Sequence, residues 1–522
     1  MATPVARTTS FTSTAEPVRS RPLSLVMRLG VLGAAAALAA SGVAAAPRSQ
    51  APASVPVTGA GAAAAVVQAA SASRSQSDNV EFVTQLPEAG MAIAINFIGD
   101  TMFVSTATGL LSYDVSDPAA PALLGALPMY IWENEDMDVD ADRNLVFISR
   151  DPRGITGIIA PPEARLFGMV HIIDVSTPAA MVQVGQFIVP AGHTSSCVSA
   201  GESRCDFLWT GGPYGNEAFG PYGRPIYSTD VRDPLNPVTC AEPINTGLYD
   251  GETGYAHDVQ VDDQGIAWVS SEGGVHGWWT FGEHLDPTTG EARQANPCQP
   301  IPYGGGGTPE EATPSRFMHN SMRPSHAQVP GDDGSLGQVL YATEEDTSTA
   351  CATSGRFATY DLRSSLGGAG FTEPAEFRLD VLDTWTPEGA EGADGCASAH
   401  YFDDRGDGLL AYSFYGQGVR FLDASDPTDI RQVGWYRPDG ANAFASYYRQ
   451  VGDELYVFVA DSGRGVDVLR FLGDGGADTP AASMPSLVAP PLPAGQFALP
   501  LAMDARFSYL CALTPRLATP LR

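Results

Sequence analysis

A short phrase that recurs along the chain constrains its fold more than any other feature. The copies read GLLSYDVSDPAAP (109–121), GMVHIIDVSTPAA (168–180), RPIYSTDVRDPLNP (224–237) and GVRFLDASDPTDI (418–430). Each is an apolar strand that ends in Asp, followed by Asp-Pro or Thr-Pro. This is a turn signal, because Pro fixes φ and Asp binds the local backbone. A second strand follows each turn, so every copy predicts two antiparallel strands.

A hairpin precedes each repeat unit, and its second strand ends in a small residue, in most units a hydroxyl residue. These strands are TMFVS (101–105), LVFIS (145–149), DFLWT (206–210), IAWVS (266–270), QVLYAT (338–343), LLAYS (409–413) and ELYVFVA (454–460). Units of four antiparallel strands at this spacing are typical of a β-propeller. The sequence therefore predicts an all-β fold, a seven-bladed propeller over residues 79–473.

The last unit has no fourth strand of its own. The segment VEFVTQLP (80–87) is similar to the fourth-strand segments ALLGALP and VGQFIVP. We expect this N-terminal strand to complete blade seven, because closing the ring removes the exposed sheet edges.

The repeated phrases resemble the LVIVD-repeat family of extracytoplasmic propellers, whose motif is a GLxIxDVSDPxxP-like strand and turn. Four copies carry the resemblance well, and GVHGWWTFGEHLDPTTG (274–290) and GRFATYDLRSS (355–365) carry it more weakly. The family is defined by its fold and repeat, so the resemblance implies architecture and says little about function.

The two ends of the chain differ from the repeat region. Arg19, Arg21 and Arg28 precede an alanine-rich apolar run that ends at a small-residue site, Ala44–Ala46. This pattern predicts a signal peptide over 1–46 and a secreted or extracytoplasmic protein. Residues 47–78 are predicted to be a flexible Ala/Ser-rich leader, and 474–522 a Pro/Ala-rich disordered tail.

Charge and cysteine content limit the partners and the compartment. The formal net charge is −31, which argues against nucleic acid as a partner because a basic footprint is missing. In an exported protein the cysteines favour disulfides over thiolate metal sites. We expect the pairs Cys197–Cys205, Cys240–Cys298 and Cys351–Cys396, although six cysteines allow 15 pairings, and Cys511 is left over.

Histidines recur at matching positions in the hairpins. His257 and His400 each lie thirteen residues before the terminal serine of their hairpin, Ser270 and Ser413. His193 matches them after allowance for a four-residue insertion. In blade five His319 is preferred over His326, because His319–Asn320 mirrors His257–Asp258.

The first strand of a blade lines the central channel, so these four histidines are expected to converge at one rim. Four imidazoles without a thiolate suit one Zn, Cu or Fe ion with open positions. The same alignment places Ala92, Asp136 and Tyr447 in this column for blades one, two and seven.

Carboxylates are predicted at the same rim. Aligning the loops after the second strands brings together Asp151, Glu272 and Glu345, with Tyr415 in blade six, and the ENED segment adds Glu135 and Asp136. These acids could orient the imidazoles, act as acid or base, or bind a hard cation.

Two functions remain open from the sequence. The first is a monomeric binding or scaffold protein that uses the channel rim to hold a protein, a glycan or a small molecule. The second is an oxidoreductase-like propeller with one transition metal ion at the four histidines. A third interpretation of the histidines is structural, since repeats copy residues by ancestry.

Overall fold

The computed structural model describes residues 74–473 apart from several segments. The segments outside the description are 130–133, 151–167, 190, 200–203, 213–224, 245–255, 288, 310–312, 316, 332–335, 347–354, 364, 366–378 and 388–397. The predicted signal peptide, most of the predicted leader and the predicted tail therefore lie outside the described residues.

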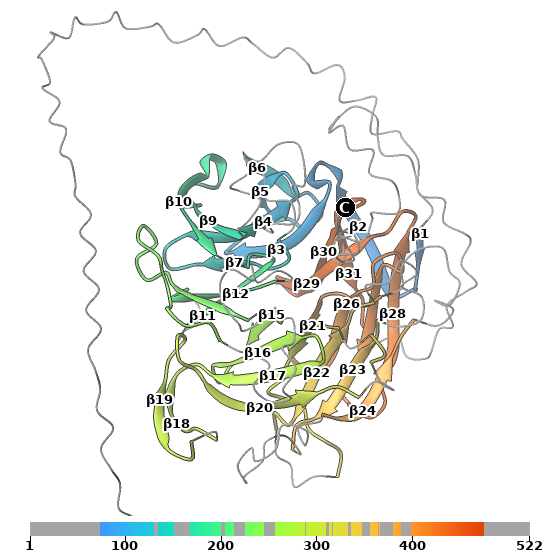
Figure 1. Ribbon diagram of the computed structural model, residues 1–522. Helices are drawn as coiled ribbons and strands as arrows, with labels where there is room; N and C mark the ends of the chain where they lie inside the picture. Colours follow the sequence, from blue (N-terminus) through green and yellow to red (C-terminus); the bar gives the residue numbers. More distant parts are fainter. Residues whose placement is uncertain are drawn as a thin grey trace, which may run out of the picture. The chain divides into compact units, whose positions relative to one another are not determined.

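The described residues form seven four-stranded antiparallel sheets arranged in a ring (Figure 1), which confirms the predicted propeller. Blades one to three comprise β3 (Ala92–Ile98), β4 (Thr101–Thr106), β5 (Gly109–Asp114), β6 (Ala122–Pro128), β7 (Met137–Asp140), β8 (Leu145–Arg150), β9 (Gly168–Asp174), β10 (Val182–Val189), β11 (Thr194–Val198), β12 (Phe207–Gly211), β13 (Tyr227–Asp230) and β14 (Val238–Thr239). Blades four and five comprise β15 (Ala256–Val261), β16 (Ile266–Ser271), β17 (Gly274–Trp279), β20 (Ile301–Gly307), β21 (Met318–Met322), β22 (Val339–Glu344), β23 (Phe357–Asp361) and β24 (Asp380–Trp385).

Blades six and seven complete the ring, and blade seven takes its fourth strand from the N-terminal side of the chain. They comprise β25 (Phe402–Asp404), β26 (Leu409–Ser413), β27 (Val419–Asp423), β28 (Arg431–Pro438), β29 (Ala443–Val451), β30 (Glu454–Asp461), β31 (Gly465–Phe471) and β2 (Val80–Leu86). The described part of the chain contains two short 3-10 turns and no α-helix, and so no helix that could cross a membrane.

The repeated turn works as the sequence predicts. In blades one, two, three and six the Asp that ends the third strand accepts a hydrogen bond from the backbone N–H two residues later. The donors are Ser116, Ser176, Arg232 and Ser425, at 2.9–3.1 Å. These side chains satisfy backbone groups in the turn, which accounts for Asp at this position of the repeat.

The hydrophobic core lies between neighbouring blades. Between blades one and seven, for example, Met102 and Val104 pack with Val466 and Val468, and all four are fully buried. Each sheet thus buries both of its faces against a neighbour, and the apolar strands follow from that burial.

Strand β2 closes the ring. It pairs antiparallel with β31 from Val80↔Phe471 to Leu86↔Val466, as the sequence predicts. A further strand, β1 (Arg74–Gln76), adds to the outer edge of blade six through β28. Ordered structure is therefore present from residue 74, inside the segment predicted as leader. The strand β1 forms there because β28 would otherwise have an unpaired edge.

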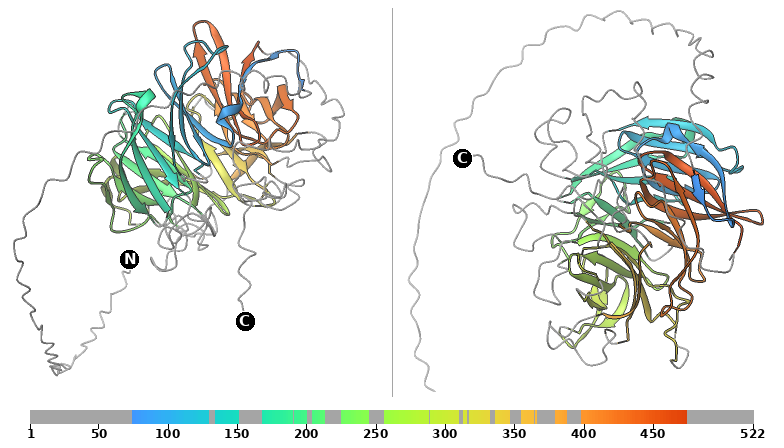
Figure 2. Two further views of the ribbon diagram at one scale, coloured as in Figure 1. Left: turned by 90° about the horizontal axis from the view of Figure 1, so that it is seen from above. Right: turned by 90° about the vertical axis from the view of Figure 1, so that its right-hand side faces the viewer.

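One other feature departs from the simple repeat. Blade four carries an inserted hairpin, β18 (Gly282–Leu285) and β19 (Ala292–Ala295), between its third and fourth strands. This insertion explains why the repeat phrase is weak at 274–290. Figure 1 labels this hairpin, and Figure 2 shows the ring of blades from two further directions.

Two of the three expected disulfides are confirmed. Cys197 and Cys205 are joined across the β11–β12 hairpin, and Cys240 is joined to Cys298 over 58 residues. The third expected pair, Cys351–Cys396, and Cys511 lie outside the described residues.

Candidate functional site

The first strands of the blades form the inner wall of the ring. Strand β3 contacts β7 and β29, β11 contacts β7 and β15, β15 contacts β21, and β29 contacts β25. Side chains at the start of these strands therefore face one another across the channel. The four histidines predicted from the repeat occupy this position in blades three to six.

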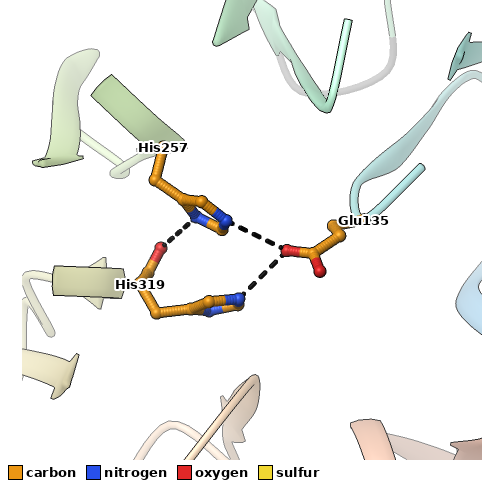
Figure 3. A group of neighbouring side chains, drawn as sticks. All are labelled: Glu135, His257 and His319. Carbon is orange, nitrogen blue, oxygen red and sulfur yellow. Dashed lines mark hydrogen bonds and ion pairs between the residues drawn. The ribbon is translucent and has the colours of Figure 1, made fainter. Parts of the chain in front are cut away.

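The four imidazoles surround one carboxylate, that of Glu135 (Figure 3 shows two of them). The Nε2 atoms of His193, His257 and His319 lie 3.3, 3.2 and 3.0 Å from Oε2 of Glu135. Nε2 of His400 lies 3.3 Å from Oε1. The four histidines are 0% exposed and Glu135 is 1% exposed, so the group is closed to bulk water.

Glu135 belongs to the same column of the repeat as the histidines. In blades four, five and seven the column residue is a β-bulge, where one extra residue stands opposite the end of the second strand. By this register the column holds Ile93, Glu135 and Phe444 in blades one, two and seven. The sequence alignment, which placed Ala92, Asp136 and Tyr447 there, is wrong because these hairpins differ in length from that of blade four.

Backbone hydrogen bonds fix the tautomers of two histidines. Nδ1 of His257 lies 2.9 Å from the carbonyl oxygen of His319, and Nδ1 of His400 lies 2.7 Å from that of Phe444. A carbonyl oxygen can only accept, so both Nδ1 atoms carry the hydrogen. In the neutral imidazole Nε2 then presents a lone pair toward Glu135. A lone pair 3.2–3.3 Å from a carboxylate oxygen requires a positive charge near it, either a proton or a metal ion.

Burial sets the protonation of these groups in the chain without an ion. Burial lowers the pKa of His257 to about 4 and, together with the charges of His400 and His257, holds the pKa of His319 well below its usual range. For His400 the charges of Glu135 and Glu345 outweigh burial and raise the pKa. Burial raises the pKa of Glu135, but the charges of His193, His400 and His319 outweigh it and hold that pKa well below its usual range. Glu135 is therefore ionised, with His400 the imidazole best placed to be charged.

The spacing of the ligand atoms fits a single ion. Nε2 of His193, Nε2 of His257 and Oε2 of Glu135 form a triangle with sides of 2.9, 3.2 and 3.3 Å. These three atoms are close enough together that all of them could bind one ion at ordinary metal–ligand distances of ~2.0–2.1 Å. One ligand atom each from Glu135, His257 and His319 also lie within 4.8 Å of one another. Glu135, His257 and His319 are therefore close enough together to hold one metal ion, and His193 and His400 flank them through the carboxylate of Glu135.

Glu345 and Tyr415 form the next layer of the site. Oε2 of Glu345 lies 4.0 Å from Nε2 of His319, and Tyr415 donates a 2.6 Å hydrogen bond to Oε1. Burial raises the pKa of Glu345 to about 7. Tyr415 has a φ of +36°, a strained value for an aromatic residue, and its ring lies 4.8 Å from that of His400.

The other predicted acids do not join the histidines. Asp136 is half-buried and accepts a hydrogen bond from Ser196 at 2.8 Å, one strand position further along the channel. Glu272 is exposed, and its backbone forms a bridge to that of Phe317. Asp151 lies outside the described residues. Of the residues aligned in the loops after the second strands, Glu345 and Tyr415 therefore reach the site.

The structure places His319, not His326, in the group. His326 lines a cavity of about 240 Å³ at the other ends of the inner strands, with its Nε2 3.5 Å from Asp404. What the sequence missed is that Glu135 lies at the centre. The signal was present, because Glu135 stands next to Asp136 as His257 stands next to Asp258. The hairpin of blade two is one residue longer than that of blade four, and this hid the register.

His171 and His276, for which no role was expected, are buried between blades and are not exposed on the sheet.

Burial lowers the pKa of His276 to about 4, against 6.5 in an unfolded chain. The unfolded state thus binds a proton more tightly, and stability should be full above pH 6.5 and fall as the pH drops toward 4. At pH 5 the buried His276 should lower the free energy of unfolding of the wild type by about 2 kcal/mol, and His276→Gln should abolish this pH-dependent loss. At pH 7.5 there is no such loss for the substitution to abolish. Urea unfolding at both pH values, with His284→Gln as control, measures the difference; an equal effect at both values would contradict it.

No family model and no curated relative matches the sequence. Among solved structures, the chain is similar to the periplasmic gluconolactonase PpgL of Pseudomonas aeruginosa, at 14% identity and a TM-score of 0.42, over 73% of this chain and 96% of that one. It is also similar to the WD40 β-propeller domain of Doa1, at 9% identity and a TM-score of 0.43, over 75% and 96%. The resemblance to the LVIVD-repeat family stays a prediction.

Proposed function

We propose that this protein is an exported propeller that holds one transition metal ion on its central axis, with His193, His257, His319, His400 and Glu135 as the binding residues. One observation carries the proposal: four buried Nε2 atoms lie 3.0–3.3 Å from the two oxygens of one buried carboxylate. A structural role alone accounts poorly for this group, because buried polar groups are retained at a cost unless each is paired.

The donor set narrows the metal. Imidazole and carboxylate ligands without thiolate suit Fe, Cu or Zn. A set of imidazoles with one carboxylate is the donor chemistry of non-heme iron sites, so we favour a redox metal such as Fe or Cu over Zn.

The surrounding residues suit catalysis of an oxidoreductase type. When bound, such a metal supplies redox or Lewis-acid chemistry. Glu345, whose Oε2 lies 4.0 Å from Nε2 of His319, is placed to exchange a proton with a group bound at the site. Tyr415 holds Oε1 of Glu345 and so keeps Oε2 directed at the histidines.

The rim that carries the site is also the surface expected to bind a protein, a glycan or a small molecule, so a binding function and a metal centre are compatible. Two disulfides support the part of the proposal that places the protein outside the cytoplasm. Export through residues 1–46, membership of the LVIVD-repeat family and a monomeric state belong to the same proposal.

Metal analysis of the mature protein tests the proposal. We expect close to one equivalent of Fe or Cu per chain after purification without chelator, or after anaerobic loading of the chelated protein. The electronic or paramagnetic resonance spectrum of the loaded protein should show nitrogen ligation. A chain that stays folded and binds no Fe, Cu or Zn under any loading condition would refute the metal centre and leave the binding function.

A further inference from the structure

A second unusual feature lies in blade six, where Arg420 is buried without a carboxylate. Arg420 is on β27, is 1% exposed, and no acidic side chain of the described chain forms an ion pair with it. Its recorded hydrogen bond runs from Nη2 to Oε1 of Gln417, at 3.3 Å. Nε and Nη1 of Arg420 are buried without an acceptor among the described residues.

Two other arginines with little-exposed side chains are paired with carboxylates. Arg323 is 4% exposed and its Nε lies 2.7 Å from Asp262, while Nε of Arg464 lies 2.8 Å from Asp467. A charge removed from water without a counter-ion costs several kcal/mol. Arg420 has no such carboxylate among the described residues, which points to a negative charge supplied by a bound group.

The surroundings of Arg420 hold further hydrogen-bond donors. Trp435 stands directly opposite Arg420 in the β27–β28 register, with its ring 5.9 Å from the guanidinium carbon. Nε1 of Trp435 and Nε2 of Gln417 are also buried without an acceptor in the described chain. Four N–H bearing atoms on three neighbouring segments thus lack an acceptor, and all four could donate to oxygen.

A second arginine adds positive charge at the same place. Arg437 is 5% exposed and lies two residues after Trp435, hence on the same face of β28. It donates from Nε to the carbonyl oxygen of Gly416 at 3.1 Å. Burial and the charge of Arg437 lower the pKa of Arg420 to about 9, so Arg420 is still a cation at neutral pH.

We infer that Arg420, Gln417 and Trp435, beside Arg437, form a binding site for an oxyanion, a carboxylate or a phosphate-type group. An oxyanion supplies both the negative charge and several acceptors, and guanidinium groups bind such groups through two parallel N–H bonds. The site lies two residues from Tyr415, which contacts Glu345, so it is on the same rim as the histidines. The inference does not depend on a metal at the histidines.

Thermal unfolding of the full mature chain tests the site. Phosphate, sulfate and succinate are each added from 0.1 to 10 mM to chloride buffer at constant ionic strength. We expect a saturable rise in Tm of at least about 2 °C with one of them for the wild type. Arg420→Met should lose the rise, while Arg431→Met, which removes an exposed arginine of the same blade, should keep it.

The choice of probe identifies the source of the group. A response to phosphate or sulfate alone points to a free or ester-bound tetrahedral anion, and a response to succinate alone points to an organic carboxylate. In chloride alone, Arg420→Met should unfold at a higher temperature than the wild type, because it removes an uncompensated buried charge. If Arg420→Met does not fold, Arg420→Lys replaces it and should bind more weakly, since lysine lacks the planar fork.

Two results would overturn the inference. One is a wild-type Tm that no oxyanion raises above the chloride control. The other is a rise of equal size and half-saturation in the Arg420 variant and the wild type, which would reflect general salt exclusion from the surface.

Discussion

A chain in which alanine replaces both His257 and His400 is expected to bind Fe or Cu at least ~100-fold more weakly than the wild type. The two substitutions remove Nε2 atoms on either side of His319, whose ring lies 4.2 Å from that of His257 and 3.9 Å from that of His400. The remaining His193, His319 and Glu135 cannot enclose the ion. We expect metal content after dialysis to fall from about one equivalent to a trace.

A matched control removes the same number of histidines elsewhere. His284 lies on the inserted hairpin and His326 lies beside Asp404, so neither belongs to the group around Glu135. A chain with His284→Ala and His326→Ala should therefore keep the full metal content. Circular dichroism should show that both double variants keep the β-sheet spectrum. Equal metal content in the two folded double variants would contradict the site.

The role of Glu135 can be separated from that of the histidines. Glu135→Gln keeps the shape of the side chain but removes the charge that three imidazole Nε2 atoms approach through Oε2. As a direct ligand Glu135 should contribute as much as a histidine, so the variant should lose about 10–100-fold in metal affinity. Unchanged affinity would show that the four imidazoles alone hold the ion.

Removal of β2 is expected to destroy the cooperative fold. A chain that starts at residue 87 loses the fourth strand of blade seven, including the buried Val80 and Leu86. It also leaves the whole edge of β31 unpaired and opens the ring between blades one and seven. We expect a loss of stability above about 4 kcal/mol, aggregation, or both.

Two longer chains serve as controls for this truncation. A chain that starts at residue 72 keeps β1 and β2, and one that starts at residue 77 loses only β1, the added edge strand of blade six. Denaturant unfolding followed by tryptophan fluorescence should give a slightly higher free energy of unfolding for the chain that starts at 72 than for the one that starts at 77. Both values should be far above that of the chain that starts at 87. A cooperative transition of normal midpoint for the start at 87 would mean that β2 does not close the propeller.

Much of the fold could be predicted because the repeat is written in local chemistry. Alternating apolar residues specify each strand, and Asp with Pro specifies each turn, as the bond from Ser116 to Asp114 illustrates. The strand VEFVTQLP could be assigned to blade seven because it matched fourth strands elsewhere. The inserted hairpin and β1 could not be predicted, since neither belongs to the repeat. In addition, β1 depends on the free edge of β28, which exists only in the folded chain.

The site was predicted in part, for a related reason. Counting back from the terminal serine located His257 and His400, because those two hairpins have equal length. The same count misplaced blade two by one residue, and a shift of one residue exchanges Asp136 for Glu135. Register in a sheet is set by cross-strand pairing and by bulges, which a count along the chain does not include.

The sequence by itself therefore determined the blade, its strands and turns, the closing strand and the four histidines, because each depends on residues close together in the chain or on a repeated pattern. Only the tertiary structure decided that Glu135 lies among the four imidazoles, that Glu345 and Tyr415 stand behind them, and that Arg420 is buried without a counter-ion. Those relations join blades far apart in sequence, and they exist only once the ring has closed and excluded water from the groups it encloses.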